Sequence, residues 1–378
     1  MTAGPEKALA VHIVVEKEPS FETEKRMEEL GALIRADGGH VVETVVQRVK
    51  VPNSSTLLGS GQVQRLNEIA LDSHADVIVL NRELTPQQQK NIELGTDRKI
   101  IDRTRLIIDI FARRAHSREG KLEVEEALLR YMLPRLAGKG VEMSQIGGGV
   151  GTRRGPGETK LEMDRRRIKE RLGRLKRLMD TVRKQRLVQQ GRRLRTRIPL
   201  VSLVGYTSAG KSTLLNGFTR AGVQSSDELF TTLDPVSRRL HLEDGSFAVL
   251  TDTVGFIENL PVQLIKAFRT TLDDVAKSDL ILLVVDVSKP DYGHDIAVVR
   301  DLLQEIGADG IPTIHVFNKA DKVGDAVSLK GLTNGYERSI VVSAVNGSGM
   351  DGLERMIHTE LAFIRHNRKI EDELHRAV

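Results

Sequence analysis

The chain has 378 residues, of which 39% are hydrophobic and 29% charged, so it has the composition of an ordinary folded protein with room for two or three domains. It contains no cysteine, which excludes disulfides, thiol catalysis and thiolate metal sites. Neither a long apolar run nor a basic-then-apolar leader is present, so we expect a cytoplasmic protein without a membrane span.

Residues 1–116 are predicted to form a small parallel α/β domain. Apolar runs alternate with segments of helical periodicity, a rhythm typical of β-α-β-α units. The expected strands are residues 8–15, 41–46, 77–80 and 99–101, and the expected helices are residues 21–36, 60–73 and 85–94. Leu58-Gly59-Ser60-Gly61 opens one helix and is either a plain helix start or an anion site, although it lacks the lysine of stronger phosphate motifs.

Residues 117–197 are predicted to form a helical hairpin of two antiparallel helices. Apolar residues recur near heptad spacing in two stripes, which we interpret as core: Leu122, Leu129, Met132 and Leu136, then Leu161, Ile168, Leu172, Leu175, Met179 and Val182. Between the stripes lies the glycine-rich loop of residues 147–157. It is either a hinge or a loop whose backbone approaches a partner closely.

The positive charge of the chain is concentrated in this hairpin. Residues 153–197 hold 18 lysines and arginines against five acidic residues, whereas the remainder holds 39 basic and 47 acidic residues. A solvated helix face is the plainer interpretation, but one-signed charge at helical spacing favours a polyanionic partner such as nucleic acid. The candidate RNA-binding residues are Arg153, Arg154, Arg165, Arg166 and Arg167.

Residues 198–367 are predicted to form a doubly wound α/β domain, followed by a tail at residues 368–378. The expected strands are residues 200–204, 247–251, 280–285, 313–317 and 339–342. Four polar motifs follow these strands, at the carboxyl ends where such folds bind ligands.

The first motif fits the phosphate-binding pattern GxxxxGK[ST] and lies between a strand and a helix, as its mechanism requires. Backbone amides of the loop wrap the phosphates, Lys211 neutralises the β/γ oxygens, and the Ser212 hydroxyl can bind Mg²⁺. The predicted nucleotide-binding residues here are Gly205, Tyr206, Thr207, Ser208, Ala209, Gly210, Lys211, Ser212 and Thr213.

The second motif, Asp252-Thr253-Val254-Gly255, has the form DxxG. Its aspartate can hold Mg²⁺, and its glycine amide can meet the γ-phosphate. The segment Phe230-Thr231-Thr232 lies between the two motifs, and we expect Thr232, rather than Thr231, to close on the metal in the triphosphate state. The predicted metal ligands are therefore Ser212, Thr232 and Asp252, and the predicted catalytic residues are Lys211, Thr232 and Gly255.

The third and fourth motifs predict guanine specificity. In Asn318-Lys319-Ala320-Asp321, the Asp321 carboxylate can accept both N1–H and the exocyclic amine of guanine, a donor pair that adenine does not offer. The stem of Lys319 can cover the base, and Asn318 can brace the loop. Ser343-Ala344 follows the next strand, where a backbone amide would meet the base. Four motifs in this order favour GTP over ATP.

These residues make the sequence resemble the HflX family of GTPases over almost its whole length. The most specific feature is the run from Gly147 to Glu162, supported by Asp102-Arg103-Thr104, Glu119-Gly120-Lys121-Leu122, Leu129-Arg130-Tyr131 and the segment Phe230–Pro235. The resemblance implies an N-terminal α/β domain, a helical hairpin and a P-loop GTPase domain. It also implies a partner in the large ribosomal subunit and its rRNA, GTP-dependent ribosome splitting, rescue or biogenesis under stress, and ATP binding by the N-terminal part. We expect a monomer.

Three residues bear on the mechanism. Many relatives carry asparagine at Ser208, where it helps to bind an activating K⁺, so serine leaves the K⁺ requirement open. Val345 stands where lysine is common elsewhere, which is tolerable because a backbone amide makes the contact. Phe256 follows Gly255 in place of a water-orienting glutamine, so we expect slow intrinsic hydrolysis that the ribosome accelerates. The alternatives are an RNA-docked switch that hydrolysis merely resets, an ATP-dependent RNA remodeller using the N-terminal domain, and a GTPase serving RNA modification.

Overall fold

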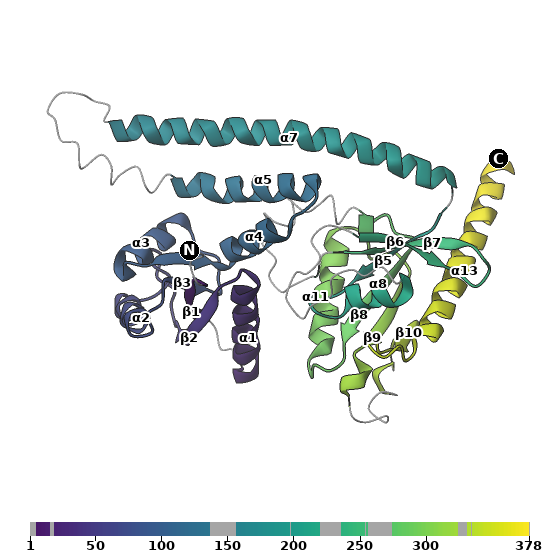
Figure 1. Cartoon of the computed structure of the whole chain (residues 1–378), viewed down its shortest axis with the longest axis horizontal. Coiled ribbons are helices and arrows are strands. Elements are labelled where there is room, and N and C mark those ends of the chain that lie inside the picture. Colours follow the sequence, from purple (N-terminus) through teal and green to yellow (C-terminus); the bar gives the residue numbers. More distant parts are fainter. Residues whose placement is uncertain are drawn as a thin grey trace. The chain divides into compact units, whose positions relative to one another are not determined.

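The computed structural model describes residues 5–15, 19–136, 156–196, 198–219, 236–253, 255, 274–323, 331–333 and 335–377 (Figure 1). Contacts divide the chain into two units. The first comprises Met1–Val182 with Pro261–Ala267, and the second comprises Arg183–Leu260 with Phe268–Val378. Each unit is built around its own sheet.

The sheet of the first unit has the order β2-β1-β3-β4, with all neighbours parallel. Its strands are β1 (Lys7–Val14), β2 (His40–Arg48), β3 (Val77–Leu80) and β4 (Lys99–Asp102). The helices are α1 (Ser20–Ala36), α2 (Ser60–Asp72), α3 (Pro86–Thr96) and α4 (Arg103–Arg114). Because right-handed connections run from β1 to β2 and back across β1 to β3, α1 covers one face and α2 and α3 the other. The predicted α/β fold is confirmed, with the ends of the predicted strands and helices shifted by at most two residues, but helix α4 was not predicted.

The amino end of α2 is capped by Gln62, a side chain of the helix itself. The Gly59 amide donates to the Gln62 side-chain oxygen at 3.0 Å, and the Gln62 amide group donates to Gln47 and to the Arg48 carbonyl. Gln62 thus satisfies a backbone donor that an anion would otherwise meet. These bonds favour the plain helix start over an anion site at Leu58–Gly61.

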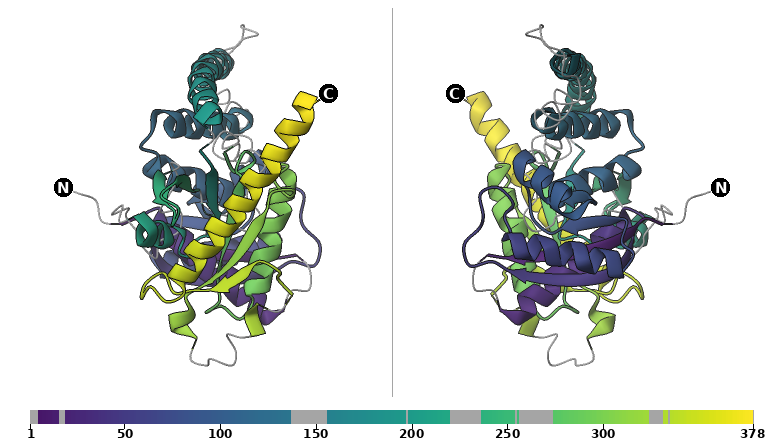
Figure 2. Two further views of the ribbon diagram at one scale, coloured as in Figure 1. Left: turned by 90° about the vertical axis from the view of Figure 1, so that its right-hand side faces the viewer. Right: turned by 90° about the vertical axis from the view of Figure 1, so that its left-hand side faces the viewer.

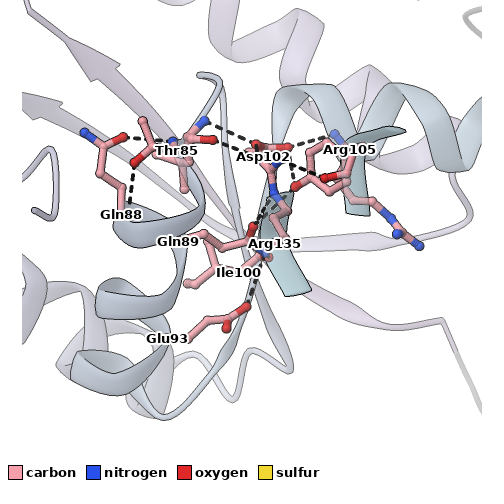
Figure 3. Close-up of polar contacts among 10 residues, drawn as sticks. Thr85, Gln88, Gln89, Glu93, Ile100, Asp102, Arg105 and Arg135 are labelled. Atoms are coloured by element: carbon pink, nitrogen blue, oxygen red, sulfur yellow. Dashed lines mark hydrogen bonds and ion pairs between the residues drawn. The ribbon is translucent and has the colours of Figure 1, made fainter. Parts of the chain in front are cut away.

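Asp102 joins the helical region to this sheet. It ends β4, is fully buried, and accepts from the Leu84 amide, the Arg105 amide, the Tyr131 hydroxyl and the Arg135 guanidinium at 2.8–3.2 Å (Figure 3). Tyr131 and Arg135 both belong to α5 (Arg118–Arg135). Burial raises the pKa of the Tyr131 hydroxyl, and the Asp102 charge raises it further, so the hydroxyl remains a donor.

We expect Asp102→Ala to lower the free energy of unfolding of the first unit by about 3–5 kcal/mol, because it leaves a nearly buried guanidinium without its carboxylate. Asp109→Ala is the matched control. It removes a half-buried partner of Arg105 on the same helix and should cost less than about 1 kcal/mol. Hydrogen exchange of the α4 and α5 amides measures both effects, and equal loss of protection in the two variants would contradict the account.

The helical region consists of α5 and α7 (Pro156–Thr196), and α7 runs back alongside α5 (Figure 1). Arg171 of α7 donates two bonds to the Glu125 carboxylate of α5 at 2.6 and 2.7 Å. The predicted apolar stripes are buried only in part. On α5 the buried apolar residues are Leu122, Val124, Ala127 and Tyr131, whereas Leu129, Met132 and Leu136 are half-buried; on α7 only Leu175 is fully buried among the described residues.

That partial burial corrects the interpretation of the stripes. The face of α5 that carries Tyr131 packs on the α/β layer through α4 and α3, so the helix buries an arc different from the heptad stripe. The glycine-rich loop and Arg153 and Arg154 lie outside the described residues.

The sheet of the second unit has the order β10-β9-β8-β5-β7-β6. The strands are β5 (Leu200–Val204), β6 (Val236–His241), β7 (Phe247–Asp252), β8 (Leu280–Asp286), β9 (Thr313–Asn318) and β10 (Ser339–Val341). All neighbours are parallel except β6, which pairs antiparallel with β7. The helices are α8 (Lys211–Thr219), α11 (Tyr292–Glu305), the short η2 (Ala320–Lys322) and α13 (Met350–Ala377).

Buried leucine, isoleucine and valine residues of the central strands make the core of this unit. Helix α13 contributes Leu353, Ile357 and Leu361, which recur every four residues and therefore share one helix face. The helix extends to Ala377 without a break at residue 368, where the sequence suggested a tail. Figure 2 shows its exposed end projecting beyond the sheet. None of the described helices is long and apolar enough to cross a membrane.

Candidate nucleotide-binding site

The phosphate-binding loop joins β5 to α8 and demands glycine at two positions. Gly210 has φ +95°, and a Cβ there would lie 2.3 Å from Nδ2 of the Asn318 side chain. A Cβ on Gly205 would lie 2.3 Å from the Val284 carbonyl oxygen. Ser208 has φ +61°, a left-handed conformation that is uncommon for residues other than glycine and asparagine. The loop is therefore wound tightly against the ends of β8 and β9.

Lys211 lies at the start of α8 with its side chain folded back over the loop. Its ammonium donates to the carbonyls of Gly205 and Tyr206, both at 3.0 Å. Burial lowers the pKa of Lys211 to about 8, although the Asp252 charge favours the ammonium form, while Lys289 opposes it. The protein thus holds a desolvated cation among carbonyls, and a polyphosphate would stabilise its charged form.

This pKa predicts a pH-dependent affinity. Lys211 has a pKa of about 8 in the folded protein and of 10.5 in the unfolded chain. Between these two pH values it loses its proton only in the folded state, so raising the pH stabilises the fold. Bound phosphates reverse the shift, so nucleotide binding above pH 8 should take up nearly one proton, and affinity should fall by up to about tenfold per pH unit. Calorimetry of GDP binding at pH 7.5 and 9 in buffers of different ionisation enthalpy measures the uptake.

Lys211→Arg supplies the control for this linkage, because the guanidinium does not titrate in this range. Proton uptake at pH 9 should disappear in that variant. Equal uptake in both proteins would contradict the assignment of the linkage to Lys211.

Two hard oxygen donors lie together at the first turn of α8. The Ser212 hydroxyl donates to an Asp252 carboxylate oxygen at 2.6 Å, and the Asp252 side chain is fully buried at the end of β7. A hydroxyl and a carboxylate oxygen are the ligands that Mg²⁺ prefers, so this pair fits the metal that the sequence implies. Thr253 ties the start of the DxxG motif to β5 through a bond from its hydroxyl to the Leu203 carbonyl at 2.7 Å.

Gly255 lies against the phosphate-binding loop. A Cβ on it would come within 2.8 Å of the Thr207 side chain and 3.1 Å of the Lys211 ammonium nitrogen. The structure therefore brings Lys211, Ser212, Asp252 and Gly255 together, as their predicted roles require. Phe230, Thr231, Thr232, Val254 and Phe256 lie outside the described residues.

Asn318 connects the phosphate end of the site to the base end. Its amide nitrogen donates to the Ala209 carbonyl at 2.9 Å, and its oxygen accepts from the Ala344 amide at 3.0 Å. The Ser343 hydroxyl donates to an Asp321 carboxylate oxygen at 2.5 Å. Because Asp321 is otherwise exposed, this bond orients the carboxylate that is predicted to meet guanine.

Sequence reasoning missed two contributors to the site. Asp286 ends β8 and pairs with Lys319 at 2.8 Å. Lys289 lies 5.0 Å from the centre of the Tyr206 ring and pairs with Asp295 at 3.2 Å. An aspartate after a buried strand was a signal for Asp286, but only the adjacency of β8 and β9 reveals its partner.

Comparisons with known proteins agree with this geometry. The sequence matches families described as GTP-binding GTPase N-terminal (residues 24–112), GTP-binding GTPase Middle Region (114–193) and 50S ribosome-binding GTPase (200–319). GTPase HflX of Caldanaerobacter subterraneus subsp. tengcongensis is 44% identical over 94% of this chain and 81% of the relative. The chain belongs to the HflX family of GTPases. HflX from Escherichia coli K12 is 40% identical over 85% of this chain and 74% of that protein.

Family membership establishes that this HflX protein binds and hydrolyses GTP. The solved structure of SsGBP in complex with GDP is 23% identical, covers 95% of this chain and 99% of its own, and has a TM-score of 0.52. At that identity the likeness shows the fold alone.

Proposed function

We propose that this chain is a cytoplasmic, monomeric GTPase that binds the large ribosomal subunit through rRNA and acts in ribosome splitting, rescue or biogenesis under stress. The match to a family described as 50S ribosome-binding GTPase supports the ribosomal partner. The observation that carries the RNA contact is the exposed basic surface of α7.

The basic surface of α7 is fully solvated along more than three helical turns. Its exposed cationic side chains are Arg165, Arg166, Arg167, Lys169, Arg174, Lys176 and Arg177. Arg166 pairs with Glu170 and Arg167 with Asp164, but both arginines are largely exposed and their partners are about half-exposed, and such pairs contribute little to stability. The arginines therefore lose little by exchanging these partners for phosphates.

Reversing the charge at Arg165, Arg166 and Arg167 together should weaken binding to the large subunit and flatten its salt dependence. Each lost phosphate contact reduces the slope of log K against log [salt] by about 0.7–0.9, so the triple glutamate variant should lose roughly 2. Reversal at Arg238 and Arg239, exposed on the edge strand β6, is the matched control and should leave the slope intact. An unchanged slope in the triple variant would contradict the assignment.

Mg²⁺ would be held by Ser212 and Asp252 with Thr232, and when bound it neutralises charge on the β- and γ-phosphate oxygens. Around it, the chain's own groups do the positioning. The loop amides and Lys211 hold the phosphates, Gly255 presents its amide beside Lys211, and Asp321 and Asn318 hold the base end. Serine at position 208, where many relatives carry asparagine, leaves the K⁺ requirement open.

Hydrolysis by the protein alone is expected to be slow, because the apolar side chain of Phe256 cannot orient water. We propose that the large subunit completes the site by positioning Thr232 and the segment of residues 252–259. Single-turnover GTP hydrolysis with and without saturating large subunits tests this proposal. Stimulation supports it, and equal rates contradict it.

A non-hydrolysable GTP analogue distinguishes a hydrolysis-driven factor from a binding switch. If the analogue splits ribosomes as fully as GTP does, hydrolysis only resets the protein. Repeating the assay with ATP alone examines a second alternative, an ATP-dependent activity in the N-terminal unit.

A further inference from the structure

The side chain of Lys319 is held at its tip by an acidic residue outside the recognised motif. Its ammonium lies 2.8 Å from an Asp286 carboxylate oxygen, and the exposed fractions of the two side chains are 16% and 5%. Lys319 also has φ +66°, a left-handed conformation that lysine rarely adopts. Such backbone strain persists where surrounding contacts determine the conformation, and it is concentrated at ligand-binding sites.

Asp286 is itself fixed in place. Its other carboxylate oxygen accepts from the Ser288 amide at 3.1 Å and from the Ser288 hydroxyl at 2.6 Å. It ends β8 directly opposite Asn318 of β9, and the Val287 amide donates to the Asn318 carbonyl at 3.1 Å. The carboxylate is therefore held beside the end of β9, the strand that leads into residues 318–321.

The charge of Asp286 is also secured. Burial alone would raise its pKa, but the bonds from Lys319 and Ser288 outweigh burial and hold the pKa below its ordinary value. Asp286 therefore stays a carboxylate, and the Lys319 ammonium stays opposite a full negative charge at neutral pH.

We propose that Asp286 is a positioning residue for guanine, which holds the tip of Lys319 so that its aliphatic stem forms a fixed wall against the face of the base. A lysine stem that is free at its end samples many rotamers, and ordering it on binding costs affinity. Anchoring it at both ends pre-organises the wall before the nucleotide arrives. This inference rests on the assignment of residues 318–321 to the base.

A merely structural ion pair would behave differently. Asp286 does not contact the phosphate-binding residues Lys211 or Ser212 through any bond found in the described part of the chain. Its loss as a positioning residue should therefore weaken GTP and GDP by the same factor and raise KM for GTP more than it lowers kcat. A structural role would instead lower the melting temperature and kcat together.

The experiment compares Asp286→Ala, Asp286→Asn, Lys319→Ala and the double variant Asp286→Ala with Lys319→Ala in the full chain. Dissociation constants for GDP and GTP, steady-state kinetics and melting temperatures are measured. We expect Asp286→Ala to weaken both nucleotides by about 2- to 150-fold, the range of coupling between contacting residues. Asp286→Asn keeps an acceptor and should lie between Asp286→Ala and the unsubstituted chain. The double variant should be no weaker than Lys319→Ala alone.

Glu360→Gln is the matched control, because it disrupts a carboxylate–cation pair with Arg338 (2.8 Å) at the opposite, amino end of β10. It should leave nucleotide affinity unchanged. Unaltered affinity in Asp286→Ala, additive effects in the double variant, or a parallel fall of kcat and melting temperature would each overturn the inference. Asp321→Ala distinguishes failure of this inference from failure of the base-site assignment. If Asp321→Ala also leaves guanine affinity unchanged, residues 318–321 do not bind the base.

Discussion

Lys211→Ala is expected to lower kcat for GTP hydrolysis by roughly 100- to 1000-fold, the effect of removing one preorganised donor from a buried site. The ammonium is desolvated, lies within 3.0 Å of two loop carbonyls, and is 3.1 Å from where a Cβ on Gly255 would lie. It is thus placed between the phosphate loop and the amide predicted to meet the γ-phosphate. Single-turnover hydrolysis at saturating GTP measures the effect.

The same substitution should not destabilise the protein itself. Burial lowers the pKa of Lys211 to about 8, so the protonated side chain is held at a cost in the folded state. Lys277→Ala, at an exposed lysine of the same unit, is the control and should keep full activity. A Lys211→Ala protein that hydrolyses GTP at the unsubstituted rate would contradict the role assigned to the ammonium.

Asp321→Asn is expected to change the base specificity from guanine to xanthine. The asparagine oxygen can still accept N1–H of guanine, but its NH2 group faces the exocyclic amine, donor against donor. Loss of that bond to a carboxylate, which contributes about 1.5–3 kcal/mol, should weaken GTP by roughly 10- to 150-fold. An asparagine amide instead offers one acceptor to N1–H and one donor to the 2-oxo group of xanthine. Its oxygen can still accept from Ser343, which orients the side chain.

Competition between GTP and XTP for hydrolysis measures this change. Asp301→Asn, at an exposed position of α11, makes the same chemical change away from the site and should leave the preference for GTP intact. If Asp321→Asn retains its preference for GTP over XTP, the base is read by other residues.

Most strands were predictable because they are short apolar runs. The edge strand β6 was not, since Val236–His241 contains two arginines and buries only Leu240. Its identity comes from antiparallel pairing with β7, a tertiary contact that local periodicity does not record. The buried face of α5 could not be predicted for the same reason, because Tyr131 donates to Asp102 of a strand distant in the sequence.

The residues of the candidate site likewise fall into those that could be predicted from the sequence and those that could not. The phosphate-binding and base-recognition motifs could be predicted because their chemistry needs fixed residue types at fixed spacing. The role of Asp286 could not be predicted, because it depends on the strand pairing that places β8 beside β9. The role of Asp102 could not be predicted either. No helix was predicted after residue 101, so both its position as the N-cap of α4 and its bonds to α5 come from the structure.

Co-sedimentation with purified ribosomal subunits tests the central claim most directly. The full chain is centrifuged with large or small subunits in the presence of a non-hydrolysable GTP analogue, GDP or no nucleotide. We predict that the protein pellets with large subunits when the analogue is present and stays in the supernatant with GDP or small subunits. Equal pelleting in all nucleotide states, or no preference for the large subunit, would contradict it.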